Sequence, residues 1–287
     1  MKIKYALIVL VLSLLLIPKT YADYRIENIT GNIYRFVDDR HRSVFAVTSE
    51  GIIVTDPLNP KAAKWLNKKL KQRFDKPVKY IIYSHNHSDH IYGAAEFDDP
   101  GITIISHHLT QQDIIRTRTR TLTPERTFTD AMTVELGDTQ LELRYHGPND
   151  GRGSISMLFK PEKVLFVVDW IVVGRMPWQR LWSYDIRGMI NSTEEVLELD
   201  FDYFVGGHAE IGNKADVANY LNYLQQLENA VIDGIHNAQT LEQIQEQVHL
   251  PEYQHLPFYK QWLHLNVAGV YERLMEESGM GWRPDIP

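Results

Sequence analysis

The sequence predicts an α+β fold in which two β-sheets pack face to face and helices cover them. Short apolar runs of strand length alternate with longer amphipathic stretches along the chain. No internal repeat, low-complexity segment or linker-like stretch is visible after residue 22. The roughly 265 residues that follow are enough for one large domain with a buried core. We therefore assign residues 23–287 to a single domain.

The first 22 residues have the organisation of a secretory signal peptide. Lys2 and Lys4 precede an apolar core over Tyr5–Ile17, and Thr20–Ala22 precedes the expected cleavage site before Asp23. This core is shorter than the ~20 residues of a transmembrane helix, so an uncleaved anchor is the less favoured alternative. No cysteine is present to carry a lipid anchor. We expect an exported protein, periplasmic in a Gram-negative source, with no stable membrane insertion after cleavage.

The apolar runs give the expected strands in chain order. They are Ile33–Phe36, Ser43–Val47, Gly51–Thr55, Val78–Tyr83, Ile102–Ser106, Thr133–Leu136, Leu141–His146, Ser154–Phe159, Lys163–Val168 and Tyr203–Gly206. Residues 117–130 lie between two of these runs and show no burial pattern. We predict an exposed loop there.

Longer stretches with helical spacing of apolar residues predict the helices. They are Lys61–Phe74, Thr110–Thr119, Arg187–Leu199, Lys214–Ile235, Leu241–Gln247 and Tyr259–Glu276. The helix after residue 213 is the clearest, because Asn213 is a candidate N-cap and Asp216 lies in the first turn. Its apolar stripe indicates core packing. The C-terminal helix is expected to cover the sheets.

Composition narrows the class of partner. The formal net charge of −7 argues against non-specific binding to nucleic acid and favours a small-molecule substrate. The absence of cysteine excludes disulfides, thiolate metal ligands and a thiol nucleophile. The oligomeric state cannot be read from the sequence.

The segment from His85 to His90 carries the clearest chemical signal. It reads His-Asn-His-Ser-Asp-His and directly follows the expected strand Val78–Tyr83. Imidazole and carboxylate are the ligands that zinc and similar divalent ions prefer. His85 and His87 can converge on one ion, while Asp89 and His90 turn toward a second. A polar loop that is merely rich in histidine is the alternative, but further candidate ligands follow other strands downstream.

The order of these motifs resembles the metallo-β-lactamase-fold hydrolase superfamily over nearly the whole chain after residue 22. The motifs in chain order are Asp56 after Ile53-Val54-Thr55, the His85–His90 segment, Gly147-Pro148-Asn149-Asp150, Asp169 after Phe166-Val167-Val168, and His208 after Gly206-Gly207. The resemblance implies a four-layer αβ/βα sandwich with a one- or two-metal centre at the sheet edge. Its glyoxalase II and lactonase branches have an aspartate at the position of Asp169, whereas β-lactamase branches generally have cysteine or serine there.

The resemblance also implies a role for each residue. His85 and His87 would bind the first metal, and the second would be bound by Asp89, His90 and His208. Asp169 would bridge both ions, and Asp56 would brace the loop. The implied cofactor is zinc, two ions per chain.

Asp150 departs from the family pattern, which usually has histidine there. Either Asp150 is itself a ligand, or His146 replaces it, or the first site is weakened. A carboxylate lowers the net positive charge of the centre, so bound water is acidified less and the preference shifts toward manganese or iron. Arg152, two residues further on, is a candidate to offset that charge.

The expected activity is hydrolysis of a small-molecule ester, lactone or amide by a metal-bound hydroxide. Asp89 would be the catalytic residue that orients this hydroxide and moves its proton. The alternatives are a non-haem iron oxidoreductase of the sulfur-dioxygenase type, a β-lactamase, and a binding module impaired by the Asp150 change. The aromatic and basic segment 170–184 either contacts an apolar substrate with an anionic group or packs against helices.

Overall fold

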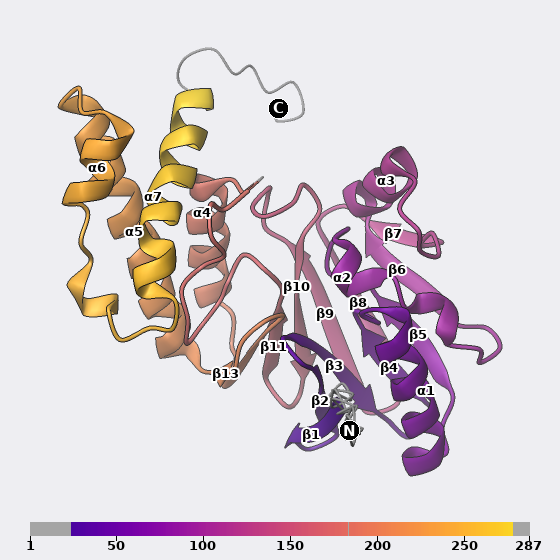
Figure 1. The fold of residues 1–287 in the computed structure, drawn as a ribbon. Helices are drawn as coiled ribbons and strands as arrows, with labels where there is room; N and C mark the ends of the chain where they lie inside the picture. The colour runs from indigo at the N-terminus through magenta and orange to yellow at the C-terminus, as the bar shows by residue number, and fades with distance from the viewer. Residues whose placement is uncertain (1–23, 183, 278–287) are drawn as a thin grey trace, which may run out of the picture.

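Two β-sheets face each other in the computed structural model, which describes residues 24–182 and 184–277 (Figure 1). The first is a seven-stranded sheet in the order β1-β2-β3-β4-β5-β6-β7. Its strands are β1 (Tyr24–Thr30), β2 (Ile33–Asp38), β3 (His41–Val47), β4 (Ile52–Thr55), β5 (Val78–Ile82), β6 (Thr103–His107) and β7 (Arg126–Phe128). Neighbours from β1 to β4 are antiparallel, and those from β4 to β7 are parallel.

The second sheet has six strands in the order β13-β12-β11-β10-β9-β8. Its strands are β8 (Ala131–Leu136), β9 (Thr139–Tyr145), β10 (Ile155–Lys160), β11 (Val164–Val167), β12 (Tyr203–Gly206) and β13 (Ile211–Gly212). Only the β11–β12 pair is parallel. Each sheet therefore contains parallel strands whose carboxyl ends point to the same edge.

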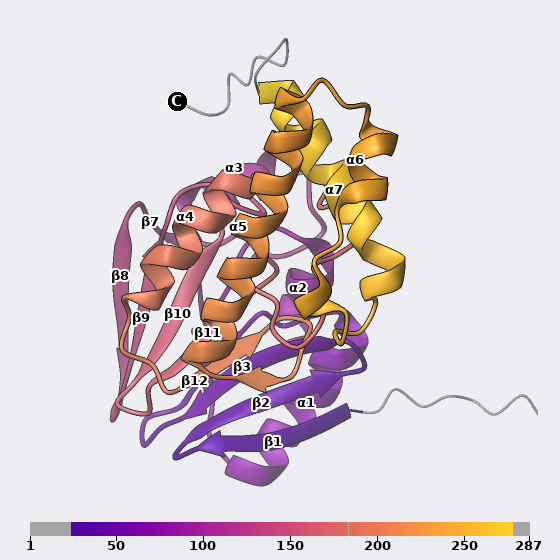
Figure 2. The same ribbon diagram turned by 90° about the vertical axis from the view of Figure 1, so that its left-hand side faces the viewer.

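Helices cover the outer face of each sheet. The helices are α1 (Pro60–Phe74), α2 (Ser88–Ile91), α3 (His108–Thr117), α4 (Ile186–Leu197), α5 (Lys214–His236), α6 (Leu241–Gln247) and α7 (Tyr259–Met275), with short 3-10 turns at Ala94–Glu96 and Pro251–Tyr253. In Figure 1, α1 and α3 lie on one side of the sheets and α4 to α7 on the other. Figure 2 shows α4 and α5 side by side along the second sheet.

Three apolar layers hold the sandwich together. The central layer lies between the sheets and includes Ile53, Ile82, Leu141 and Phe166. A second layer packs the first sheet against α1 and its neighbours, and a third packs the second sheet against α4 to α7. Because apolar burial is the main driving force for folding, these three layers hold the two sheets and both helical layers together.

The expected four-layer α+β sandwich is confirmed. Asn213 caps α5 and forms a reciprocal capping box with Asp216, as its position predicted. The prediction for residues 117–130 is wrong in part, because Arg126–Phe128 pairs with β6 as strand β7 and buries Phe128. A strand of three residues is too short to show alternation. The edge strands β1 and β13 were also missed, and both carry little buried surface.

The expected signal peptide lies outside the described residues. Within 24–182 and 184–277, no helix is long and apolar enough to cross a membrane.

Candidate metal centre

The predicted ligands come from segments that follow strands of both sheets. The parallel strands β4 and β5 lead to Asp56 and to the segment that begins at His85, and the parallel strands β11 and β12 lead to Asp169 and His208. Asp150 follows β9. Carboxyl ends of adjacent parallel strands meet at one sheet edge, which is where α/β folds place their sites.

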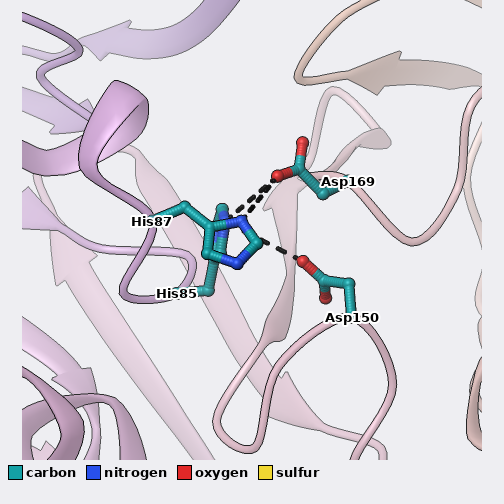
Figure 3. Close-up of side chains that lie close together, drawn as sticks. All are labelled: His85, His87, Asp150 and Asp169. Atoms are coloured by element: carbon teal, nitrogen blue, oxygen red, sulfur yellow. Dashed lines mark hydrogen bonds and ion pairs between the residues drawn. The ribbon is translucent and has the colours of Figure 1, made fainter. Parts of the chain in front are cut away.

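A first donor group consists of His85, His87, Asp150 and Asp169, whose donor atoms all lie within 4.8 Å of one another (Figure 3). Asp169 Oδ2 lies 3.2 Å from His85 Nε2 and 3.0 Å from His87 Nδ1. Asp150 Oδ2 lies 3.8 Å from His85 Nε2. Ligand atoms that surround one ion tetrahedrally at about 2.1 Å are about 3.4 Å apart, so this spacing suits a zinc-sized ion.

A second donor group consists of His90, His208 and Asp169. His208 Nε2 lies 3.1 Å from His90 Nε2 and 3.0 Å from Asp169 Oδ1. The two groups therefore share Asp169, which offers Oδ2 to the first and Oδ1 to the second. Asp89 approaches the second group, with its Oδ2 3.6 Å from the Nε2 atoms of both His90 and His208.

Unpaired buried atoms test whether a metal fits here. Among the described residues, both carboxylate oxygens of Asp150 are buried without a hydrogen-bond partner. His85 Nε2 and Asp169 Oδ1 form no hydrogen bond either, and their close polar contacts are with other members of the donor groups. Leaving such atoms unpaired is costly, and a carboxylate without a partner costs most. Cations held by the two donor groups would give each of these four atoms a partner. The donor set therefore fits one or two divalent ions.

Neighbouring groups orient the ligand histidines. Asp56 is fully buried and accepts hydrogen bonds from the backbone N–H and the hydroxyl of Ser84. Because the Ser84 hydroxyl donates to Asp56, its oxygen accepts from His85 Nδ1–H at 2.7 Å. The lone pair of His85 Nε2 is then free to bind a metal. His208 Nδ1 lies 3.0 Å from the carbonyl oxygen of Arg40, so its Nε2 faces the site. Such partners fix imidazole tautomers in metal sites.

Two aspartates at the centre, Asp56 and Asp169, have unusual backbone geometry. Asp56 has φ 38° and Asp169 has φ 67°, both in the left-handed region. Aspartate tolerates this region better than most residues. Both residues directly follow strands, where the chain turns at the edge of the sheets.

Burial and charge shift the pKa values of the ligands in opposite directions. Burial lowers the pKa of His85 to about 3, so its imidazole is neutral and ready to bind a metal. Burial also lowers the pKa of His90, but the nearby Asp169 and Asp56 carboxylates outweigh this and raise the value to about 9. Burial and the charge of Asp169 raise the pKa of Asp150. These values describe the metal-free centre, in which His90 carries a proton that a metal would replace.

Asp150, and not the alternative candidate His146, lies in the first donor group. His146 Nδ1 contacts Glu195 at 2.8 Å, and its Nε2 contacts Ser156 at 2.8 Å. Both ring nitrogens are thus occupied outside the donor groups. Asp150 lies in the first group and His146 does not. Arg152 also does not offset Asp150, because its guanidinium pairs with the buried Asp113 at 3.3 Å.

A cavity of about 520 Å³ adjoins the first donor group. Its lining includes Asn86, His87, Asn149, Asp150, Arg152, Arg180, Trp182, Tyr184, Gly269, Glu272 and Arg273. Some aromatic residues of segment 170–184 pack in the core, and others are exposed beside the cavity. Trp170 is fully buried in the core, whereas Trp178 and Trp182 are 39% and 59% exposed. Trp182 borders the cavity.

Helix α7 forms part of the cavity wall, which sequence reasoning missed. Asn266 donates to the carbonyl oxygens of Pro177 and Gln179. A Cβ at Gly269 would lie 1.8 Å from the carbonyl oxygen of Arg180, so only glycine allows this approach. Asn266 and Gly269 therefore hold the loop of residues 177–180 against α7. A buried asparagine and a glycine inside an expected helix were the available signals.

His41, at the start of β3, was also missed. Its Nε2 lies 3.3 Å from Asp89 Oδ2, and together with Asp89 and His208 it forms a third group of candidate donor atoms. A single histidine after a turn carries no spacing signal in the sequence.

The fold and the centre define the class of protein. The family model of the metallo-beta-lactamase superfamily matches residues 38–208, and the chain belongs to this superfamily. The resemblance proposed from the motifs is therefore confirmed at the level of the superfamily, and its glyoxalase II or lactonase branch is not.

Among curated relatives, two subunits of one enzyme from Nocardioides sp. (strain JS1661) are similar. The chain is 30% identical to "2,4-dinitroanisole O-demethylase subunit alpha" over 63% of its own length and 56% of that protein. It is 26% identical to subunit beta over 72% of its own length and 66% of that protein. The chain thus spans roughly three fifths of the curated relatives it matches.

Solved structures share the fold at low sequence identity. A metallo-beta-lactamase from Pontibacter korlensis matches with a TM-score of 0.62 at 18% identity, over 70% of this chain and 99% of that one. A double mutant of the sec-alkyl sulfatase PisA1 matches with a TM-score of 0.72 at 16% identity, over 91% of this chain and 51% of that one.

Proposed function

We propose that this protein is a metal-dependent hydrolase that cleaves an ester, lactone, amide or activated aromatic ether in a small molecule. The observation that carries the proposal is the pair of donor groups that share Asp169 beside a cavity of about 520 Å³. Membership of the metallo-beta-lactamase superfamily supports it. The aromatic ether is included because relatives are named for O-demethylation of 2,4-dinitroanisole.

In this proposal, one set of residues would bind the metal ions and Asp89 would also transfer a proton. Bound divalent ions, proposed to be two zinc ions, would polarise the scissile group and acidify a water molecule. Asp169 would hold the two positions side by side, with His85, His87 and Asp150 at the first and His90, His208 and Asp89 at the second. Asp89 would orient the attacking water, take its proton and pass it to the leaving group as the scissile bond breaks.

The cavity sets the size and character of the substrate. A volume of about 520 Å³ suits a drug-sized molecule and not a polymer. Trp182 supplies an exposed aromatic face, and Arg152 and Arg116 share the single buried carboxylate of Asp113. The lining also carries Arg180, Arg273, Asp185, Glu272 and Glu276, so charged groups of both signs surround the cavity. An aromatic substrate with a strongly polarised substituent fits this lining best.

The first test is metal content together with a substrate panel. The protein is purified without a chelator or a metal-affinity tag, and zinc, manganese and iron are counted per chain. Esters, lactones, amides, β-lactams and nitroaryl methyl ethers are then assayed with the metal found. We expect about two ions per chain, and loss of hydrolysis by more than about 100-fold in His87→Ala. The exposed His249→Ala serves as the matched control.

Full turnover by metal-free protein would overturn the proposal. One iron per chain with oxygen consumption on a persulfide would replace it with the oxidoreductase alternative. Bound metal with no turnover of any panel member would favour a binding module.

We also propose that the protein is exported with its signal peptide removed. The proposal is supported only by the N-terminal sequence pattern. Mass spectrometry of protein recovered from a Gram-negative periplasm should show a chain that begins at Asp23. A chain retained in membranes and beginning at Met1 would contradict it.

A further inference from the structure

We propose that His41 is a positioning residue, which holds the Asp89 carboxylate at the second metal position by donating a hydrogen bond from Nε2. The inference rests on the proposed metal centre but not on the reaction catalysed there. None of the sequence motifs that indicate the centre includes His41.

Asp89 needs such a support more than the other ligands do. Its side chain is 44% exposed, whereas those of His90 and Asp169 are 0% and 7% exposed. It also lies on α2, a single helical turn. A carboxylate with this freedom loses conformational entropy when it binds an ion. Within the described residues its ion-pair partners are His41, His90 and His208, of which the last two form the compact second group.

His41 and His208 both approach the same oxygen of the Asp89 carboxylate. Asp89 Oδ2 lies 3.3 Å from His41 Nε2 and 3.6 Å from His208 Nε2. A carboxylate oxygen has two lone pairs, so one can face the ion while the other accepts the N–H of His41. The Nε2–H of an imidazole can supply this donor. Partners of this kind are typical of ligating carboxylates.

The turn between β2 and β3 is fixed in the position that this role requires. The backbone N–H of Arg42 donates to the carbonyl oxygen of Gly207 at 2.8 Å, and the carbonyl oxygen of Arg40 accepts from His208 Nδ1 at 3.0 Å. The Arg42 guanidinium also donates to the carbonyl oxygen of Asp39 at 2.6 Å. One turn thus orients two residues of the second site: His208 through the backbone of Arg40, and Asp89 through the side chain of His41.

Metal affinity tests the assignment directly. The two dissociation constants for zinc are measured by competition with a chromophoric chelator, and the second site is observed by the visible spectrum of the cobalt-substituted protein. In His41→Ala we expect the constant of the second site, identified by its cobalt spectrum, to rise 10- to 100-fold, with the constant of the first site unchanged. His41→Gln places an amide N–H near the same point and should restore most of the affinity. His249→Ala is the matched control.

A double-mutant cycle separates positioning from direct ligation. If His41 acts through Asp89, the double variant His41→Ala/Asp89→Ala should bind the second ion no more weakly than Asp89→Ala alone. An additive loss would make His41 a direct ligand and overturn the proposal. The proposal would also be overturned if the zinc dissociation constant of the second site in His41→Ala lay within about twofold of the wild-type value. Failure of the proposed hydrolysis is a separate result, because these readouts do not use turnover.

Discussion

The carboxylate of Asp150 is buried, and neither of its oxygens has a hydrogen-bond partner among the described residues. Such a group is stable only beside a cation or in its protonated form. Its place next to His85 and His87 favours the cation. We therefore propose that Asp150 is a metal ligand and that the change from the usual family residue does not impair the centre.

Substitution of Asp150 tests this explanation. Asp150→Asn keeps the shape but removes the charge, and we expect first-site metal affinity to fall about 10- to 100-fold. Asp150→His restores the usual family residue but brings a larger ring into a site packed around a carboxylate, so hydrolysis should fall by about tenfold or more. Affinity titration and kcat/KM measure the two effects, with the exposed Asp138→Asn as control. Higher activity in Asp150→His would instead indicate an impaired centre.

Proton release on metal binding follows from the ligand pKa values. The pKa of His90 is about 9, so at pH 7 the metal-free protein carries a proton there that an ion must displace. Metal affinity should therefore rise with pH from 6 toward 9 and level off above it. Calorimetric titration with zinc at pH 7 in two buffers of different ionisation enthalpy should show release of about one proton or more. Equal heats of binding in both buffers would contradict the raised pKa of His90.

At the scale of elements, helix α7 and the loop before α4 form one structural unit. The loop carries Arg180 and Trp182 to the cavity, and it rests on α7 at Gly269. Helix propensity alone would make Gly269→Ala stabilising by about 1 kcal/mol. Contact with the Arg180 carbonyl outweighs this gain, because a Cβ at Gly269 would lie only 1.8 Å from that oxygen.

We expect Gly269→Ala to lower the free energy of unfolding by about 1–3 kcal/mol and to raise KM more than it lowers kcat. Bound metal should be unchanged, because α7 supplies no ligand. Thermal unfolding, steady-state kinetics and elemental analysis measure the three effects. The exposed Gln261→Ala on the same helix is the control. Unchanged KM would show that the loop does not shape the substrate site.

For the whole molecule, the sequence predicted the sandwich because long buried strands and amphipathic helices are visible locally. It also predicted which residues gather at the centre, since they follow strand ends in family order. It could not predict His41 or the α7 wall. Both depend on contacts across the fold, between Asp89 and His41 and between Gly269 and Arg180. His41 leaves no local pattern, and a glycine within a helix does not identify the residue that it contacts. Strand β7 was missed because three residues are too few to show alternation.

The proposed ions would also join the two sheets. His85 and His87 follow a strand of the first sheet, whereas Asp150, Asp169 and His208 follow strands of the second. Without a cation, Asp150 and Asp169 repel each other in a buried site, and this repulsion contributes to the raised pKa of Asp150. An ion that binds only the folded chain stabilises it by about 2.7 kcal/mol at 100 times its Kd. The sandwich should therefore depend on metal for part of its stability.

Removal of metal measures this contribution. We expect the Tm to fall by about 5–10 °C after treatment with a chelator and to recover on addition of zinc, because the loss of one tightly bound ion costs a few kcal/mol in a domain of this size. Magnesium should not restore the Tm, since it binds imidazole poorly. His87→Ala should show a smaller dependence on zinc than the wild type, because it loses a ligand of the first group. An identical Tm with and without chelator would mean that the two sheets are held together by their apolar layers alone.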